Sequence, residues 1–476
     1  MKILYVASEV TPYAASGGLG DVMGALPRTV KRQLGKDSEV SVILPLYAGI
    51  PAVYRSAMKK VTEGICPLAW RRAYYGVYRL SSAGVNYYFI DNEQYFKRGR
   101  MYGEFDDGER FAFFCRAVIA FMQDTGWYPD VLHANDWQAA MAIIYLKTRF
   151  AFHPELSRIR TLFTIHNIEY QGKYDMAILG DVFDIPGEYA SAVEYDGCIN
   201  LMKGAMQLSD RVNTVSPHYA EELRDPYFSF GLDPMVREVS DKFSGIVNGL
   251  DTVFFDPSNG DEIAYPYKRS TLAAGKAENK KFLQEELGLP VVPDVPLVAM
   301  VTRLTPAKGV DLVIRILDEL LFENLQFVLL GTGNGDYEYI LREIAGRHPD
   351  SARVLCTFDR TLSKRIYAAA DIFLMPSRSE PCGLAQMTAC AYGTVPVVRG
   401  VGGLYDTIIP YGRENSNGFV FYNYNAHDLL FRVKDAISLY HAGDGEWEKL
   451  RRRAMRSDFS WKHSAGAYIE LYNSLC

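Results

Sequence analysis

Short apolar runs alternate along the first half of the chain with longer segments whose apolar residues recur at helical spacing. The runs predict strands at 2–8, 40–45, 85–90, 131–133 and 161–165, and a helix is predicted from about Val22. Alternation of this kind is typical of parallel sheets that are covered by helices on both faces.

The second half repeats this plan more clearly. Predicted strands cover 297–301, 325–330, 353–358, 372–375 and 395–398, and predicted helices cover 310–321, 362–370 and 384–392. The least periodic stretches, 254–270 and 288–296, are rich in the prolines and glycines of a linker. We therefore predict an α/β fold of two doubly wound domains, 1–245 and 246–458, that face each other across a deep cleft.

Composition narrows the classes of function. A chain of 476 residues with 48% hydrophobic and 23% charged residues fits a globular protein with two large domains. No apolar run approaches the ~20 residues of a membrane span, and we expect no secretory signal because the chain begins directly with a strand.

A net charge of −6 without basic blocks argues against nucleic acid or an anionic membrane as partner. Seven cysteines without a C-x-x-C pair favour reduced thiols in a cytoplasm and no structural zinc site.

A glycine-rich segment, 16–21, lies between the first predicted strand and the first predicted helix. Glycine lets a ligand approach the backbone closely, and the start of a helix offers unpaired N–H groups to an anion. A tight turn from strand to helix explains the same pattern equally well, because short glycine patterns have many false positives.

Polar residues follow two later strands of the first half. Asp136 follows the strand 131–133, and His166 follows the strand 161–165. A carboxylate at the carboxyl end of a strand is placed to hydrogen-bond sugar hydroxyls, although Asp136 also suits a helix N-cap. A lone histidine is more often a structural group. Two polar strand ends in successive units nevertheless favour a shared site.

Three loops of the second half combine charge with glycine. Arg303 and Lys308 share one loop, where two cations suit a diphosphate, although a solvated basic loop is the more usual explanation. Glu380 lies in the proline-bounded loop 376–384, which is expected to hold it rigidly at the mouth of the sheet. The loop 400–404 offers further backbone N–H groups to a phosphate.

Together these segments resemble those of the bacterial and plant-type glycogen and starch synthases. That family consists of retaining glycosyltransferases with two Rossmann-like domains, the GT-B fold. The likeness runs nearly from end to end and is carried by 15–19, 136–137, 165–172, 216–220, 247–249, 379–384 and 459–461. The Glu-Pro-Cys-Gly-Leu segment at 380–384, followed by Gly-Gly-Leu at 402–404, is its most specific part.

The resemblance implies a role for each matching residue. The expected catalytic residues are Asp136, His166, Arg303, Lys308 and Glu380. The expected donor-binding residues are Gly18, Asn248, Arg303, Lys308, Phe358, Cys382, Gly383, Leu384, Gly403 and Leu404. Among these, Phe358 would stand beside the adenine, and Gly18, Gly403 and Leu404 would offer N–H groups. The segment 459–476 would contain a helix that crosses back to the N-terminal domain.

The resemblance also implies the reaction, which is transfer of glucose from ADP-glucose to the non-reducing end of an α-1,4-glucan with retention of configuration. The leaving diphosphate would stay on the reacting face and accept the proton of the incoming hydroxyl, so the protein must supply positive charge to it. A bound metal is another source of charge. The chain contains no Asp-x-Asp motif, which agrees with a site that needs neither a metal nor another cofactor.

Four residues depart from the family pattern. Ala15 stands where a lysine is usual, Gln138 where histidine is common, Ala307 where glutamine is usual, and Ser379 where phenylalanine is usual. These departures leave open UDP-glucose as the donor, or a sugar-nucleotide-binding protein with weakened catalysis. A retaining transferase that acts on sucrose, trehalose or a lipid is a further alternative, against which the full-length likeness argues.

Overall fold

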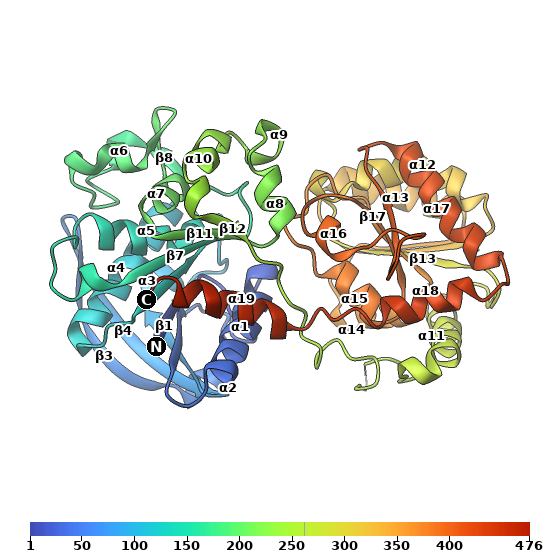
Figure 1. Cartoon of the computed structure of the whole chain (residues 1–476), viewed down its shortest axis with the longest axis horizontal. Coiled ribbons are helices and arrows are strands. Elements are labelled where there is room, and N and C mark those ends of the chain that lie inside the picture. The colour runs from blue at the N-terminus through green and yellow to red at the C-terminus, as the bar shows by residue number, and fades with distance from the viewer. Residues whose placement is uncertain (261) are drawn as a thin grey trace. The chain divides into compact units, whose positions relative to one another are not determined.

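The computed structural model describes residues 1–260 and 262–476 and divides the chain into two compact units (Figure 1). Unit 1 comprises Met1–Gly249 together with Trp461–Cys476, and unit 2 comprises Leu250–Ser460. The aperiodic stretch 254–270 includes residue 261, which lies outside the described residues. No helix in the described part of the chain is long and apolar enough to cross a membrane.

Unit 1 is built on a nine-stranded sheet in the order β12-β11-β7-β6-β1-β2-β5-β4-β3. All neighbours pair in parallel except β5–β4 and β4–β3, which pair antiparallel. The strands are β1 (Lys2–Val6), β2 (Glu39–Pro45), β3 (Lys59–Leu68), β4 (Arg71–Ser82), β5 (Val85–Asp91), β6 (Val131–Asn135), β7 (Arg160–Ile165), β11 (Arg211–Thr214) and β12 (Phe243–Gly245). A small second sheet contains β8 (Lys173–Asp175), β9 (Glu194–Tyr195) and β10 (Cys198–Asn200).

Eleven α-helices of the described residues surround these sheets of unit 1. They are α1 (Gly18–Leu34), α2 (Ala52–Ala57), α3 (Glu93–Phe96), α4 (Asp107–Thr125), α5 (Trp137–Lys147), α6 (Ala190–Val193), α7 (Leu201–Leu208), α8 (Pro217–Glu222), α9 (Pro226–Ser229), α10 (Asp233–Glu238) and α19 (Trp461–Asn473). The helix predicted from about Val22 begins earlier, because the extended Gly17 ends the preceding loop and serves as the N-cap.

Unit 2 contains one parallel sheet of six strands in the order β15-β14-β13-β16-β17-β18. The strands are β13 (Leu297–Val301), β14 (Gln326–Leu330), β15 (Ala352–Leu355), β16 (Ile372–Met375), β17 (Val395–Arg399) and β18 (Phe419–Phe421). The α-helices are α11 (Leu272–Glu286), α12 (Val310–Leu321), α13 (Gly335–Arg347), α14 (Arg360–Ala369), α15 (Ala385–Ala391), α16 (Gly402–Thr407), α17 (Ala426–His441) and α18 (Glu446–Ala454).

The sheet of unit 2 is buried on both faces, which explains why its strands are continuous apolar runs. Successive residues of β13 belong to different cores: Val298 and Met300 pack with α12 on one face, and Leu297 and Ala299 pack on the other. Two α/β units with parallel sheets confirm the predicted fold class.

Each unit has a switch point where the chain crosses to the other side of its first strand, and the loops beside this point are the expected binding loops. In unit 2 the chain runs from β13 outward to β15 and then returns to place β16 on the other side of β13. In unit 1 the same reversal occurs between β1 and β6. Ligands of doubly wound sheets bind beyond the carboxyl ends of the strands at such switch points. The loops that follow β1, β6, β13 and β16 are therefore the expected binding loops.

The C-terminal helix α19 is an integral part of unit 1. It packs against α1, and the side-chain amide of Gln33 donates to the carbonyl of Lys462 (Figure 1). Two of its tyrosines, Tyr468 and Tyr472, are fully buried against the sheet. Residues of β1 and of α19 thus pack in the same hydrophobic core.

A buried chain of hydrogen bonds joins α19 to the central strands. His133 Nε2 lies 2.5 Å from Thr164 Oγ1, and His133 Nδ1 lies 2.9 Å from the Tyr472 hydroxyl. Thr164 donates to Asn213 Oδ1, which can only accept, so Thr164 accepts from His133 Nε2–H. Burial holds the pKa of His133 well below its usual range, so the ring is neutral, and the Tyr472 hydroxyl beside Nδ1 donates to the hydroxyl of Tyr5.

We predict that Tyr472→Phe lowers the free energy of unfolding by about 1–3 kcal/mol, because the buried His133 loses a hydrogen-bond partner. The Tyr472 hydroxyl also lies 2.8 Å from that of Tyr5, which loses the same partner. Guanidinium unfolding followed by circular dichroism measures the change. Tyr339→Phe, on a side chain that is 65% exposed, is the control. Equal unfolding midpoints for the two variants would contradict this role of α19.

Candidate active site

Two loops meet at the switch point of unit 2, and their backbones are in direct contact. The loop 302–309 follows β13, and the loop 376–384 follows β16. The Arg378 N–H donates to the carbonyl of Ala307 at 2.9 Å. Gly309 has φ +69°, and a Cβ there would lie 2.0 Å from the carbonyl oxygen of Pro376. Only glycine therefore lets the two loops pack at this distance.

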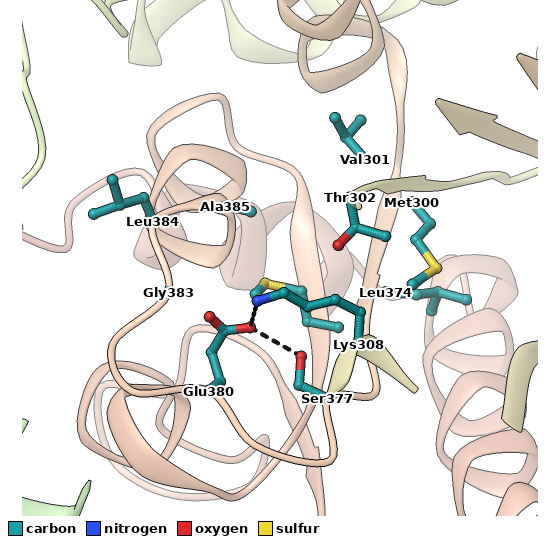
Figure 2. A pocket seen from close by; sticks show the side chains of 11 residues that line it. Met300, Val301, Thr302, Lys308, Leu374, Ser377, Glu380, Gly383, Leu384 and Ala385 are labelled. Atoms are coloured by element: carbon teal, nitrogen blue, oxygen red, sulfur yellow. Dashed lines mark hydrogen bonds and ion pairs between the residues drawn. The ribbon is translucent and has the colours of Figure 1, made fainter. Parts of the chain in front are cut away.

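These loops enclose a pocket of about 110 Å³ at the carboxyl ends of β13 and β16 (Figure 2). Its polar lining includes Lys308, which ends a single 3-10 turn, and Glu380. Lys308 Nζ lies 2.6 Å from Glu380 Oε2, and Ser377 Oγ donates to the same oxygen at 3.0 Å. Gly383 and Leu384 line the pocket beside this cluster. The structure thus brings together four of the predicted residues, Lys308, Glu380, Gly383 and Leu384.

The glycine loop after β17, 400–404, packs against the backbone of residues 380–382. A Cβ at Gly402 would lie 2.0 Å from the Glu380 carbonyl oxygen, and one at Gly403 would lie 2.2 Å from that of Cys382. The Gly403 N–H donates to the carbonyls of Glu380 and Pro381, both at 3.2 Å.

The N–H groups of Gly403 and Leu404, which are predicted to serve a phosphate or a sugar, bind backbone carbonyls in this structure. Gly403 donates to the 380–381 backbone and Leu404 donates to the carbonyl of Val401 at 3.0 Å, and their role at the donor stays a prediction. Both residues are buried. In the structure the loop holds the Glu380 segment in place, because backbone can pack against backbone only where side chains are absent.

The remaining predicted residues of unit 2 lie outside the pocket lining. Arg303 shares the loop of Lys308 but is exposed, and its guanidinium pairs with no described residue. Phe358 lies between β15 and α14 with its ring 88% exposed. Cys382 belongs to the same loop as Glu380 and is buried, and its carbonyl accepts from the Gln386 amide at 3.1 Å.

In unit 1, Asp136 and His166 come together at the ends of β6 and β7. Asp136 stands at the N-cap position of α5, but its carboxylate does not cap that helix. Instead Oδ1 accepts the N–H of His166 at 2.7 Å and that of Asn167 at 3.4 Å. The backbone of Asp136 has φ +57°, which costs energy for any residue with a side chain and is typical of functional sites.

The charges of this pair differ from those of free side chains. Burial raises the pKa of Asp136 from 3.8 to about 7, although the two backbone N–H groups oppose the shift. Burial lowers the pKa of His166 from 6.5 to about 3, so the ring is neutral at physiological pH. Because Asn135 Oδ1 can only accept, the bond of 3.0 Å from His166 Nε2 fixes the proton on Nε2. His166 Nδ1 is then an acceptor for a ligand hydroxyl.

Gly18 and Asn248 occupy different parts of unit 1. Gly18 is the exposed first residue of α1, and no described atom lies within 4 Å of where its Cβ would be. Asn248 is buried, and its Oδ1 has no hydrogen-bond partner among the residues described. Among the described residues, the hydrogen bonds of the Asp136 and His166 side chains involve neither of them.

Three polar residues that support these sites, Glu9, Asn135 and Ser377, are not predicted from the sequence pattern. Glu9, only 4% exposed, accepts from the Ser16 N–H at 2.5 Å, the Ser16 hydroxyl at 2.7 Å and the Gly17 N–H at 3.0 Å, which shapes the glycine loop before α1. Asn135 orients His166, and Ser377 binds Glu380. Two of the three could have been found by their proximity in sequence to predicted site residues: Asn135 precedes Asp136, and Ser377 lies in the loop of Glu380.

None of the described residues forms a group of three or more His, Cys, Asp or Glu side chains that could hold a metal ion. The charged groups at the pocket of unit 2 are instead Lys308 and Glu380. Their ion pair offsets the cost of removing both from water.

Family models match both units. Residues 2–238 match the starch synthase catalytic domain, and residues 283–455 match the glycosyl transferases group 1. A glycogen synthase of Geobacillus thermodenitrificans is 45% identical over 479 residues, which cover 100% of this chain and 98% of that protein. A glycogen synthase of Streptococcus mutans is 44% identical and covers 100% of both chains.

Solved structures show the same similarity. The catalytic domain of starch synthase IV from Arabidopsis thaliana, bound to ADP and acarbose, superimposes with a TM-score of 0.89 at 33% identity and covers 99% of this chain and 98% of that one. A sucrose-phosphate synthase from Thermosynechococcus elongatus, at 18% identity and a TM-score of 0.61, covers 100% of this chain and 98% of that one and shares the fold.

We predict that Asp136 titrates near pH 7 in the free protein. In ¹³C NMR of protein labelled at the aspartate carboxyl carbons, one resonance is expected to titrate with a midpoint at about 7, and to be absent from Asp136→Asn. Because the folded-state pKa lies above the ordinary 3.8, the stability that the protonated group contributes is lost as the pH rises through about 7. A spectrum in which all aspartates titrate near 4 would contradict this environment.

Proposed function

The chain belongs to the family of glycogen and starch synthases and is a glucosyltransferase, and we propose that it transfers glucose from ADP-glucose to the non-reducing end of an α-1,4-glucan with retention of configuration. One observation carries the proposal. In a chain that matches glycogen synthases along its whole length, Lys308 and Glu380 meet at the switch point of unit 2. Ligands of this fold bind at that edge of the sheet.

Unit 2 supplies what a leaving diphosphate needs. The Lys308 ammonium has three donors and uses one on Glu380, so it can also bind a phosphate oxygen. Arg303 is exposed on the same loop and presents a planar guanidinium with five donors. We propose that these two cations stabilise the charge that develops on the diphosphate as the glycosidic bond breaks. That diphosphate then accepts the proton of the attacking glucan hydroxyl.

Glu380 and the two residues of unit 1 are proposed to orient the glucose. A carboxylate with one oxygen already bound has the other available to accept a sugar hydroxyl. Neutral His166 presents Nδ1 as an acceptor, and Asp136 accepts hydroxyl protons when it is ionised. Fixed acceptors of this kind hold the ring in the reacting geometry. The entropy of orienting the ring is then lost on binding and not at the moment of transfer.

The choice of ADP-glucose over UDP-glucose is a proposal with two supports. The relatives in the comparisons are bacterial glycogen synthases, and the similar starch synthase IV structure holds ADP. Ala15 bears on the affinity of this chain for its donor. It is exposed beside the glycine loop, and its side chain offers no charge where the family usually has lysine. We therefore expect donor binding to depend more heavily on Arg303 and Lys308.

We also propose that the reaction needs no metal ion, since Lys308 and Arg303 can do the electrostatic work of one. A cytoplasmic location is proposed as well. All seven cysteines are free in the structure, which suits a reducing compartment.

We predict that the protein releases nucleoside diphosphate only when glycogen is present. We expect kcat/KM to be at least about tenfold higher for ADP-glucose than for UDP-glucose, since a preference of ~1.4 kcal/mol for the adenine base corresponds to that ratio. Labelled glucose should appear in α-1,4-linked glucan. A coupled assay for ADP and UDP, followed by enzymatic digestion of the product, measures both. Equal use of the two donors would overturn the choice of ADP-glucose, and label in a free disaccharide or a lipid would overturn the acceptor.

We predict that Lys308→Ala and Glu380→Gln each lower kcat/KM by about 10²-fold or more, because one charged contact in a transition state contributes ~3–4 kcal/mol. Initial rates with ADP-glucose and glycogen measure the effect. The matched control is Lys449→Ala, which removes an exposed lysine of α18 that pairs with Glu446 at the surface. Near-normal rates in either folded variant would remove that residue from the site.

We predict that transfer continues in excess EDTA at a rate within about twofold of the untreated enzyme, because protein cations supply the positive charge. The measurement is the initial rate before and after dialysis against the chelator. Loss of activity that Mg²⁺ or Mn²⁺ restores would show that a metal takes part.

A further inference from the structure

The two oxygens of the Glu380 carboxylate are in different situations. Oε2 accepts two hydrogen bonds, from Lys308 Nζ at 2.6 Å and from Ser377 Oγ at 3.0 Å. Oε1 accepts none from any side chain or N–H that the structure describes, and Figure 2 shows it pointing away from Lys308 and Ser377, toward Gly383. A carboxylate bound through one oxygen in this way presents the other to a ligand in a fixed direction.

Ser377 is itself held firmly. It is 1% exposed and follows β16. Arg399, the last residue of β17, donates from Nη1 to the carbonyl of Arg378 at 2.8 Å and approaches that of Ser377 at 3.5 Å. Arg399 is only 9% exposed. The backbone at Ser377 is therefore held by the neighbouring strand before any ligand binds.

Lys308 and Ser377, which both bind Oε2, are expected to respond differently to the binding of the donor. The Lys308 ammonium is attracted to the incoming diphosphate, which competes with Glu380 for it. The Ser377 hydroxyl is neutral and buried, so the diphosphate does not draw it away. Ser377 is then the group that keeps Oε2 in place while Lys308 turns to the phosphate.

We propose that Ser377 is a positioning residue for transfer: it holds Glu380 in the orientation that presents Oε1 to the glucose, independently of Lys308. This role presupposes the proposed transfer reaction and adds a residue to it. Loss of the hydroxyl leaves Glu380 in the pocket with its charge intact but without a fixed direction. The effect is expected on kcat, where orientation matters, rather than on KM for the donor, which the cations and the nucleotide determine.

A double-mutant cycle of Ser377→Ala and Glu380→Ala tests the proposal. Ser377→Ala is expected to lower kcat about tenfold or more with ADP-glucose and glycogen, and to change the donor KM by less than about threefold. In the Glu380→Ala background the same change is expected to lower kcat by less than about twofold, since there is no carboxylate left to position. Single-turnover transfer of radiolabelled glucose gives the sensitivity that the Glu380→Ala background needs.

Two further variants separate positioning from loss of structure. Ser377→Cys leaves almost no cavity and replaces the hydroxyl by a weak donor, so it should match Ser377→Ala in kcat. Ser416→Ala removes a hydroxyl that is equally buried in unit 2, at 2% exposure, and that does not line the pocket. It should leave kcat unchanged. Thermal unfolding of each variant confirms that the fold is intact.

Each outcome supports or overturns the positioning role of Ser377. A tenfold loss that disappears without Glu380 supports the positioning role. The role is overturned if Ser377→Ala leaves kcat unchanged, or if it lowers kcat equally with and without Glu380. If the unaltered protein transfers no glucose to glycogen at all, the proposed function fails, and that result is distinct from an active enzyme that is indifferent to Ser377.

Discussion

The position of Glu380 depends on contacts between backbones that only glycine allows. Gly309 packs against the strand end at Pro376, and Gly402 and Gly403 pack against the carbonyls of residues 380 and 382. A Cβ at any of the three would lie within 2.0–2.2 Å of a carbonyl oxygen. The loops that follow β13, β16 and β17 are therefore fixed against one another before any side chain is considered. The ion pair of Lys308 with Glu380 follows from that packing.

The two units contribute different electrostatics to the proposed reaction. In the proposed reaction, unit 2 offers the positive charge of Lys308 and Arg303 to the leaving diphosphate. Unit 1 presents acceptors instead: a histidine kept neutral by burial and an aspartate whose pKa is raised to about 7. This division suits a transfer in which one partner leaves as an anion and the other is a neutral sugar ring. The α19 helix contributes to unit 1 indirectly, through the buried chain of hydrogen bonds that includes His133, two residues before Asn135.

Apolar periodicity predicted most strands and the class of fold, because parallel strands buried on both faces are continuous apolar runs. It missed the hairpin of β3 and β4, whose residues alternate between exposed and buried. The motifs predicted Lys308, Glu380, Asp136 and His166 as site residues, and the structure groups them into two pairs. What the sequence did not reveal was how the supporting groups pair. Ser377, Asn135 and Glu9 act through hydrogen bonds whose partners are set by folding, and the Gly403 N–H is bound to backbone carbonyls.

We propose that the donor reacts at the Lys308–Glu380 pair, at the switch point of unit 2. The most direct measurement is a crystal structure of the protein with ADP and a maltooligosaccharide bound. The account predicts a diphosphate oxygen at about 3 Å from Lys308 Nζ and a sugar hydroxyl at hydrogen-bond distance from Glu380 Oε1, with Ser377 still on Oε2. Nucleotide bound elsewhere, with the ion pair as it stands here, would contradict it.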